Sequence, residues 1–269
     1  MIARAWLMSG IMLLTLLFLL FPFVVVVGAS FDTGGAYHIA FPPRGISLAA
    51  YADIPAKYLH AVLVSLGVGT VVAVLATAIG GVAALGLMAG RLVGRTALEA
   101  FFRLPVQIPL VVTGAAFLQF YYELAAWTGV NLLEGLGGLI VAHTFVAIPY
   151  SVAAIAAVLA RFDPALEEAA ESLGAGPWST FWRVTFPNIR PGIVAGFFYA
   201  FIVSFSDVPI AVFIVQAKNT TIPVQLFLDM QFDFTPAMLA ASTLVAAGSL
   251  ALILGVQRLF GFDLVQSRR

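Results

Sequence analysis

Cysteine is absent from the 269 residues, and charged residues make up only 10% of them. The absence of thiols excludes cysteine-based catalysis and any metal site with cysteine ligands. A soluble domain usually has about 25% charged residues, so the scarcity of charge indicates a chain that lies largely in lipid. Lysine plus arginine equals aspartate plus glutamate, and the resulting net charge of zero argues against nucleic acid as a partner.

Sequence motifs for catalysis are also missing. The sequence contains no GxxxxGK[ST] phosphate-binding loop, so this chain is not expected to hydrolyse ATP. It contains no HExxH zinc motif, and no serine and histidine stand in a recognisable hydrolase motif. The short run Gly67-Val68-Gly69 lies inside an apolar segment and is not a dinucleotide fingerprint. We therefore expect a non-catalytic protein that itself holds no metal and no cofactor.

Long apolar runs dominate what is present. A helix needs about 20 apolar residues to cross the hydrocarbon. Six segments meet this requirement, namely 6–27, 59–89, 105–127, 136–160, 191–215 and 238–260. The first exceeds the apolar core of a signal peptide, although Val27-Gly28-Ala29 loosely resembles a cleavage site. Because lipid offers no partner to open backbone groups, we expect an all-α integral membrane protein with six transmembrane helices.

Lysine and arginine predict how these spans are oriented. Ten of the 13 basic residues fall on one side: Arg4, Arg91, Arg95, Arg103, Arg161, Arg183, Arg190, Arg258, Arg268 and Arg269. Only Arg44, Lys57 and Lys218 fall on the other. The positive-inside rule then places both termini in the cytoplasm. Segments 28–58 and 216–236 face outward, and the first, rich in glycine, proline and aromatic residues, is expected to be an ordered loop.

A charged stretch, DPALEEAAESLGAGPWSTFWRVTFP, separates the fourth and fifth spans at residues 163–187. Asp163 followed by Pro164 predicts the start of a helix, because aspartate caps free amides and proline suits the first helical position. Glu167 and Glu168 complement the helix dipole in the first turn. Gly174 is expected to end the helix in the left-handed conformation.

A second short helix is predicted from Gly176-Pro177 onward, with Trp178, Phe181 and Trp182 as its apolar side chains. Pro187 and Pro191 are expected to flank the start of the fifth span. The stretch would thus be two short helices with a sharp corner on the cytoplasmic surface. A hairpin lying on the bilayer would need basic residues, of which the first helix has few. Small alanines instead favour the close approach of another protein.

The order Glu168-Ala169-Ala170, Gly174, Val184, Phe186, Pro187 resembles the EAA loop of permease subunits of binding-protein-dependent ABC importers. That family usually has Ile and Leu where this chain has Val184 and Phe186. The resemblance implies the permease fold over 59–260, preceded by a span and outer loop at 1–58 and followed by a cytoplasmic tail at 261–269. It also implies a place in the bacterial inner membrane.

The resemblance further implies that residues 163–187 couple the spans to a cytoplasmic ATPase. The candidate coupling residues are Glu167, Glu168, Ala169, Ala170, Leu173, Gly174 and Pro187. The implied partners are an ATPase dimer that binds ATP and Mg²⁺, a second homologous permease, an external solute-binding protein (periplasmic or lipid-anchored) and membrane lipid. A different, rather than identical, second permease is favoured by similarity to the C-type permease of spermidine/putrescine importers.

That similarity is carried by SFSDVPIAVF (204–213), TIPVQLF (221–227) and STLV (242–245). A polyamine-like solute is therefore expected, while relatives that carry ferric iron, aminoethylphosphonate or other small solutes leave the substrate open. An ion-coupled secondary transporter is a further alternative, but it would need inverted repeats and midplane ion ligands.

Polar groups inside spans are costly, so they are candidates for a substrate pathway. The candidates are Asp207, Ser204, Ser206, Gln119 and Glu123. Asp207 could be an anionic point on the path of a cation or a structural hydrogen-bonding group. Gln119 and Glu123 share one helix face, which could line a pore or meet external water. His143 is expected to be a buried, hydrogen-bonded histidine.

Glycines recur at spacings that would let helices approach closely. They are Gly80, Gly86, Gly90, Gly94, Gly192 and Gly196.

Overall fold

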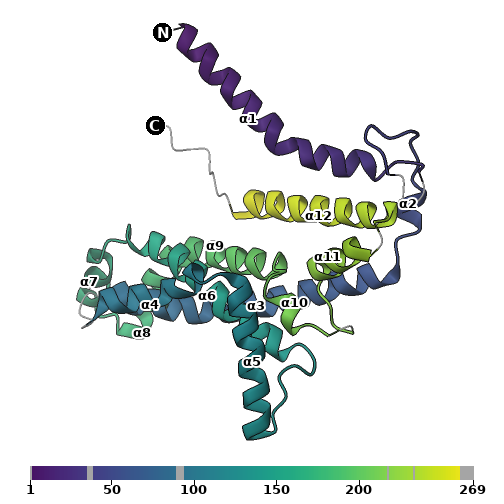
Figure 1. Cartoon of the computed structure of the whole chain (residues 1–269). Helices are drawn as coiled ribbons and strands as arrows, with labels where there is room; N and C mark the ends of the chain where they lie inside the picture. Colours follow the sequence, from purple (N-terminus) through teal and green to yellow (C-terminus); the bar gives the residue numbers. More distant parts are fainter. Residues whose placement is uncertain (1, 35–38, 89–93, 217, 233, 261–269) are drawn as a thin grey trace. The chain divides into compact units, whose positions relative to one another are not determined.

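The computed structural model describes residues 2–34, 39–88, 94–216, 218–232 and 234–260. Within these ranges the regular elements are helices, and one isolated bridge pairs Asp32 with Ile46. The helices are α1 (Ile2–Ala29), α2 (Ala49–Ala52), α3 (Ala56–Met88), α4 (Arg95–Gln107), α5 (Leu110–Thr128), α6 (Gly137–Leu159), α7 (Ala165–Ser172), α8 (Pro177–Thr180), the π-helix η1 (Phe181–Thr185), α9 (Phe186–Phe205), α10 (Ala211–Ile214), α11 (Ile222–Phe232) and α12 (Pro236–Phe260) (Figure 1). The expected all-α class is confirmed.

Five helical stretches are each long and apolar enough to cross a membrane: Trp6–Ala29, Ala56–Met88, Gly137–Leu159, Pro177–Phe205 and Pro236–Gly255. The pair α4 and α5 passes the same test only together, and it is bent by 97°. The described chain therefore has six candidate spans if this bent pair is one of them.

The prediction that the third span is one helix over 105–127 was wrong. Pro105 lies within α4, that helix ends at Gln107, and a new helix begins at Leu110. The break falls at Ile108, whose ψ of 131° is extended, as the residue before a proline prefers. Pro109 has no amide hydrogen to continue the ladder of α4, so the chain turns sharply there.

Residues 60–225 form one compact unit, in which α6 packs along α9 (Figure 1). Its apolar core joins α3, α6 and α9 through Ala84, Leu87, Val152, Ile155, Leu159 and Ile189. Close helix contact depends on glycine at particular sites. A Cβ on Gly80 would lie 2.8 Å from Ser151 Cβ, and one on Gly196 would lie 3.2 Å from Ser151 Cα. Ser151 also donates its hydroxyl to the Gly196 carbonyl at 3.0 Å.

Only some of the glycines predicted to let helices approach lie at helix contacts. A Cβ on Gly192 would lie 3.1 Å from Ile155 Cα, as expected of a packing glycine, but a Cβ on Gly86 would meet nothing within 4 Å. Gly94 is a left-handed residue before α4 with φ 81°. Gly90 lies outside the described residues, as do Arg91 and the tail at 261–269.

The fifth span differs from the expected 191–215. Its helix begins earlier, runs through Pro187 and Pro191, and ends at Phe205, so neither proline stands before it. Asp207 and Pro209 lie beyond this end, in a turn that leads to the short helix α10. Proline lacks the amide hydrogen needed to continue a helix, which fits a break at this place.

The described residues within 1–59 and 226–260 form the other compact unit. Its loop folds around Asp32, whose buried carboxylate accepts the amides of Ala40 at 3.0 Å and Arg44 at 2.8 Å. These backbone hydrogen bonds hold the pKa of Asp32 below its ordinary value of 3.8. Ser30 and Tyr51 join the two ends of the loop through hydroxyls 2.7 Å apart. Local contacts therefore order the described part of this loop.

Candidate functional site

The first limb of the candidate coupling stretch is α7, and local sequence sets both of its ends. Asp163 Oδ1 accepts the amide of Ala165 at 3.0 Å, and the helix begins at Ala165, one residue after the expected Pro164, which is the cap residue instead. At the other end Gly174 has φ 88°. Its amide bonds to the Glu171 carbonyl, and the amide of Ala175 bonds to that of Ala170 at 3.0 Å. This pair of hydrogen bonds is a Schellman motif, which stops a helix and reverses the chain.

The second limb is the beginning of a transmembrane helix. Gly176 is extended, Pro177 takes the first helical position, and helix continues from there to Phe205. Within it, η1 has the wider π pattern, and the amide of Phe186 bonds to the Phe181 carbonyl five residues back. Pro187 follows and has no amide to donate, so the wider turn adjusts the helix next to this proline.

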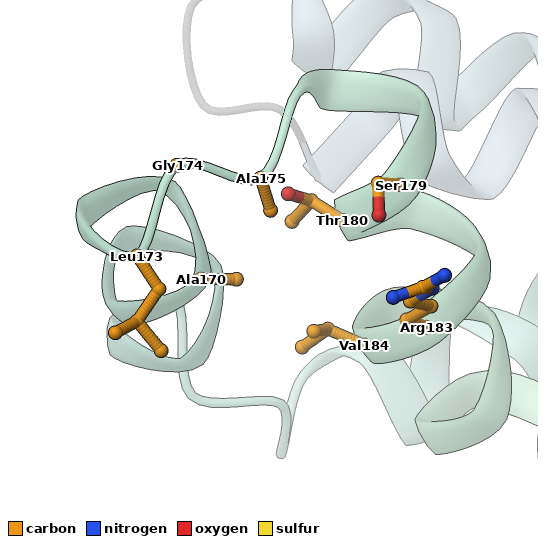
Figure 2. A pocket seen from close by; sticks show the side chains of 8 residues that line it. All are labelled: Ala170, Leu173, Gly174, Ala175, Ser179, Thr180, Arg183 and Val184. Carbon is orange, nitrogen blue, oxygen red and sulfur yellow. The ribbon is translucent and has the colours of Figure 1, made fainter.

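Residues 163–187 are called the elbow from here on. Its two limbs enclose an open cleft of about 420 Å³. Figure 2 shows Ala170, Leu173 and Gly174 on the side of α7, with Ser179, Arg183 and Val184 opposite. Three of the candidate coupling residues therefore line one hollow surface.

Large apolar side chains of the elbow are exposed on its surface. Leu173, directly after α7, is 89% exposed, and Trp178, in the first turn of the second limb, is 73% exposed. Exposed apolar surface next to a cleft is typical of a binding site for another macromolecule. Glu168 and Ala169 are exposed on the same limb, and Pro187 is exposed on the other.

The side chain of Glu167, unlike those of the nearby Glu168 and Glu171, makes a hydrogen bond within the elbow. Its Oε1 accepts a hydrogen bond from the hydroxyl of Thr185, the last residue of η1. Thr185 is buried and Glu167 is half-buried, whereas Glu168 and Glu171 are exposed. Sequence reasoning did not single out Thr185, because no local pattern pairs residues 18 positions apart.

The candidate pathway residues do not form one cluster. Asp207 is only 8% exposed, and its Oδ1 accepts the amides of Ile210 at 3.0 Å and Ala211 at 2.9 Å. The same oxygen lies 3.4 Å from Nε2 of His143. Ser204 is buried, and its Oγ lies 2.9 Å from His143 Nδ1. Ser206 is exposed and donates to the Ile202 carbonyl.

The remaining two candidates are on α5. Gln119 Nε2 donates to Glu123 Oε1 at 3.1 Å, as their four-residue spacing predicted, and both side chains are exposed. Between them, Tyr121 is fully buried and donates its hydroxyl to the Gly138 carbonyl at 2.7 Å. The pair Gln119–Glu123 thus lies on the open face of α5, and Tyr121 holds the opposite face against α6. Among the described residues no group of three or more His, Cys, Asp or Glu side chains could hold a metal ion.

Comparison with known proteins agrees with this architecture. Residues 76–265 match the family described as binding-protein-dependent transport system inner membrane component. The chain belongs to this family and is therefore a multi-pass membrane permease component of the ABC importer class.

Among its relatives, the putrescine transport system permease protein PotI of Escherichia coli K12 is 30% identical over 87% of this chain and 84% of PotI. The spermidine/putrescine permease protein PotC of Haemophilus influenzae is 26% identical over 93% and 95%. A probable sulfate transport permease protein, cysT of Chlorokybus atmophyticus, is 36% identical over 65% of this chain. The matched region spans only 62% of that cysT.

Solved structures share the fold at low sequence identity. A bacterial ABC transporter involved in the import of the acidic polysaccharide alginate has a chain with a TM-score of 0.69 at 16% identity, and 97% of each chain is covered. The same kind of transporter, in complex with an alginate pentasaccharide-bound periplasmic protein, gives a TM-score of 0.70 at 19% identity, covering 96% of this chain and 95% of that one.

Proposed function

We propose that this chain is the pore-forming permease subunit of an ATP-driven, binding-protein-dependent importer of a small solute. The observation that carries the proposal is the continuity of the elbow with a span. One helix runs from Pro177, at the corner of the elbow, to Phe205. A displacement applied to the elbow by a partner would therefore reach a transmembrane helix without a break in helical structure between them.

The surface of the elbow supports docking of a partner rather than catalysis. It presents the open cleft, the exposed Leu173 and the exposed carboxylate of Glu168. In the proposed assembly a cytoplasmic ATPase dimer binds ATP and Mg²⁺ and grips the elbow. A second, homologous permease completes the pore, and a binding protein delivers solute from outside. The solved complex of an alginate transporter with its periplasmic protein supports this kind of arrangement.

A polyamine-like cation is the proposed solute. The two polyamine permeases align with this chain over 84% and 95% of their own lengths, so the likeness covers most of each protein. Sulfate is the second candidate, because a sulfate permease relative has the higher identity, 36%, over its shorter matched region. Ferric iron and aminoethylphosphonate are further alternatives for the solute.

Uptake into membrane vesicles tests both the proposed ATP-driven importer and the proposed solute. The chain is co-expressed with its partner ATPase, second permease and binding protein, which we expect neighbouring genes to encode, and vesicles are given radiolabelled putrescine or sulfate. We expect ATP-dependent accumulation of putrescine. Sulfate uptake instead would change the solute but keep the importer. Uptake that follows an ion gradient without ATP would show an ion-coupled secondary transporter and reject the proposed function.

A charge reversal on the elbow tests its role in the same vesicles. Glu168→Lys should separate ATP hydrolysis from uptake, because an exposed carboxylate at the docking surface becomes a cation. Glu171→Lys makes the same charge change on the same helix, outside the candidate coupling residues, and is the matched control. Equal, wild-type uptake per ATP in both variants would remove the elbow from the mechanism.

A further inference from the structure

The two limbs of the elbow are joined at two places with a hollow between them. One joint is the covalent turn at Gly174, and the other is the hydrogen bond from Thr185 to Glu167. Glu167 is in the first turn of α7 and Gly174 follows its last, so the joints lie roughly 10 Å apart along the helix axis. The cleft occupies the space between the limbs, where Ala170 faces Val184 without filling it (Figure 2).

The chemistry of the second joint makes it a firm contact. A hydroxyl that donates to a carboxylate forms a charge-assisted hydrogen bond, which is stronger than a neutral one. Thr185 is 5% exposed, so water competes little for its hydroxyl. Among the hydrogen bonds of the described residues, this is the side-chain bond that links α7 to the helix over 177–205.

The position of Thr185 gives the contact mechanical importance. Thr185 is the last residue of η1, directly before α9 and two residues before Pro187. A π-helical turn beside a proline has fewer regular hydrogen bonds than an α-helix and is the place where this long helix can change direction. The side chain of Glu167 therefore attaches α7 to the far end of the irregular segment, next to the span.

We propose that Glu167 is a positioning residue that acts through Thr185 and makes α7 move together with α9. The inference rests on the proposed function and assigns Glu167 an internal role, in contrast to the exposed Glu168. A load applied to α7 then reaches α9 by two routes, the turn at Gly174 and the Glu167–Thr185 contact. Without the contact, α7 would swing about the turn alone and the span would follow less.

Four variants in the full transporter test this inference. Thr185→Val removes the donor but keeps the shape, and Glu167→Ala removes the acceptor. Thr185→Ser retains the donor and Glu167→Gln retains a neutral acceptor, and they are the conservative controls. We expect solute transported per ATP hydrolysed to fall about tenfold in the first two, the scale of one lost hydrogen bond to a charged group. It should stay near wild type in Thr185→Ser and fall less in Glu167→Gln, whose hydrogen bond is kept but is no longer charge-assisted. The double variant should be no worse than either single variant, because both remove one interaction.

Amide hydrogen exchange of residues 165–172 provides a second measurement that needs no transport. In the full chain purified in detergent, exchange should be faster in Thr185→Val and Glu167→Ala than in the two controls. Equal amounts of assembled complex show that the variants fold.

Two outcomes overturn the inference. If Glu167→Ala uncouples but Thr185→Val transports normally, Glu167 contacts the ATPase itself. If neither variant changes coupling or exchange, the contact has no mechanical role. Failure of the proposed function looks different, because the wild-type chain would then show no ATP-dependent uptake at all.

Discussion

His143 and Ser204 are in direct contact, with Nδ1 of the imidazole 2.9 Å from the serine Oγ. They are 61 positions apart and join α6 to α9 where both side chains are almost fully buried. The other ring nitrogen of His143 lies 3.4 Å from Asp207 Oδ1. The contact between His143 and Ser204 ties the end of α9 to the neighbouring span.

Loss of this contact should lower stability. Ser204→Ala leaves a buried ring nitrogen without its partner, which costs about 1–3 kcal/mol. The midpoint of thermal unfolding in detergent, followed by tryptophan fluorescence, is the measurement. Ser206→Ala is the matched control, because Ser206, directly after α9, is exposed and its hydroxyl donates to the carbonyl of Ile202 four residues back. An equal midpoint for both variants would show that the His143 contact contributes nothing.

The substitution Asp207→Asn distinguishes the negative charge of Asp207 from its structural hydrogen bonds. An asparagine Oδ1 can still accept the amides of Ile210 and Ala211, so the turn into α10 should survive. If the carboxylate attracts a cationic solute, putrescine uptake in vesicles falls while the amount of assembled transporter stays constant. We expect that decrease. Unchanged uptake would leave Asp207 with a structural role only.

A substitution at Gly174 tests whether the left-handed turn holds the corner between the two limbs of the elbow. Its φ of 88° is unfavourable for any residue with a Cβ, by about 1–2 kcal/mol, so Gly174→Ala should loosen the end of α7. Faster amide exchange at Ser172 to Ala175 would report this. Gly176→Ala is a suitable comparison, since Gly176 has φ −76° and a Cβ there would meet nothing within 4 Å. If both variants exchange alike, the left-handed turn is not what holds the corner.

Gly80 tests close packing between α3 and α6. Gly80→Val would bring atoms to within 3 Å of Ser151 and force the helices apart, at a cost of about 1–3 kcal/mol. Gly86→Val makes the same change on the same helix, where the structure leaves open space. The first variant should unfold at a lower temperature in detergent than the second. The reverse order would contradict the packing seen here.

Hydropathy alone predicted the fold class, because each span must satisfy its own backbone in lipid regardless of its neighbours. Local chemistry likewise predicted the left-handed Gly174 after α7 and, to within one residue, the start of that helix, since both depend on residues only a few positions apart. The predicted pair Gln119–Glu123 formed for the same reason. The motif from Glu168 to Pro187 also indicated the family, which the comparison then showed.

Tertiary structure decided the remainder. The sharp bend at Ile108, the continuous helix through Pro187 and the end of α9 at Phe205 depend on how prolines are accommodated, which sequence rules state only as a tendency. Gly80 packs and Gly86 does not, because only the fold determines which face of α3 meets α6. The partners of Glu167 and His143 are distant in sequence, so only the packed helices could bring each pair together.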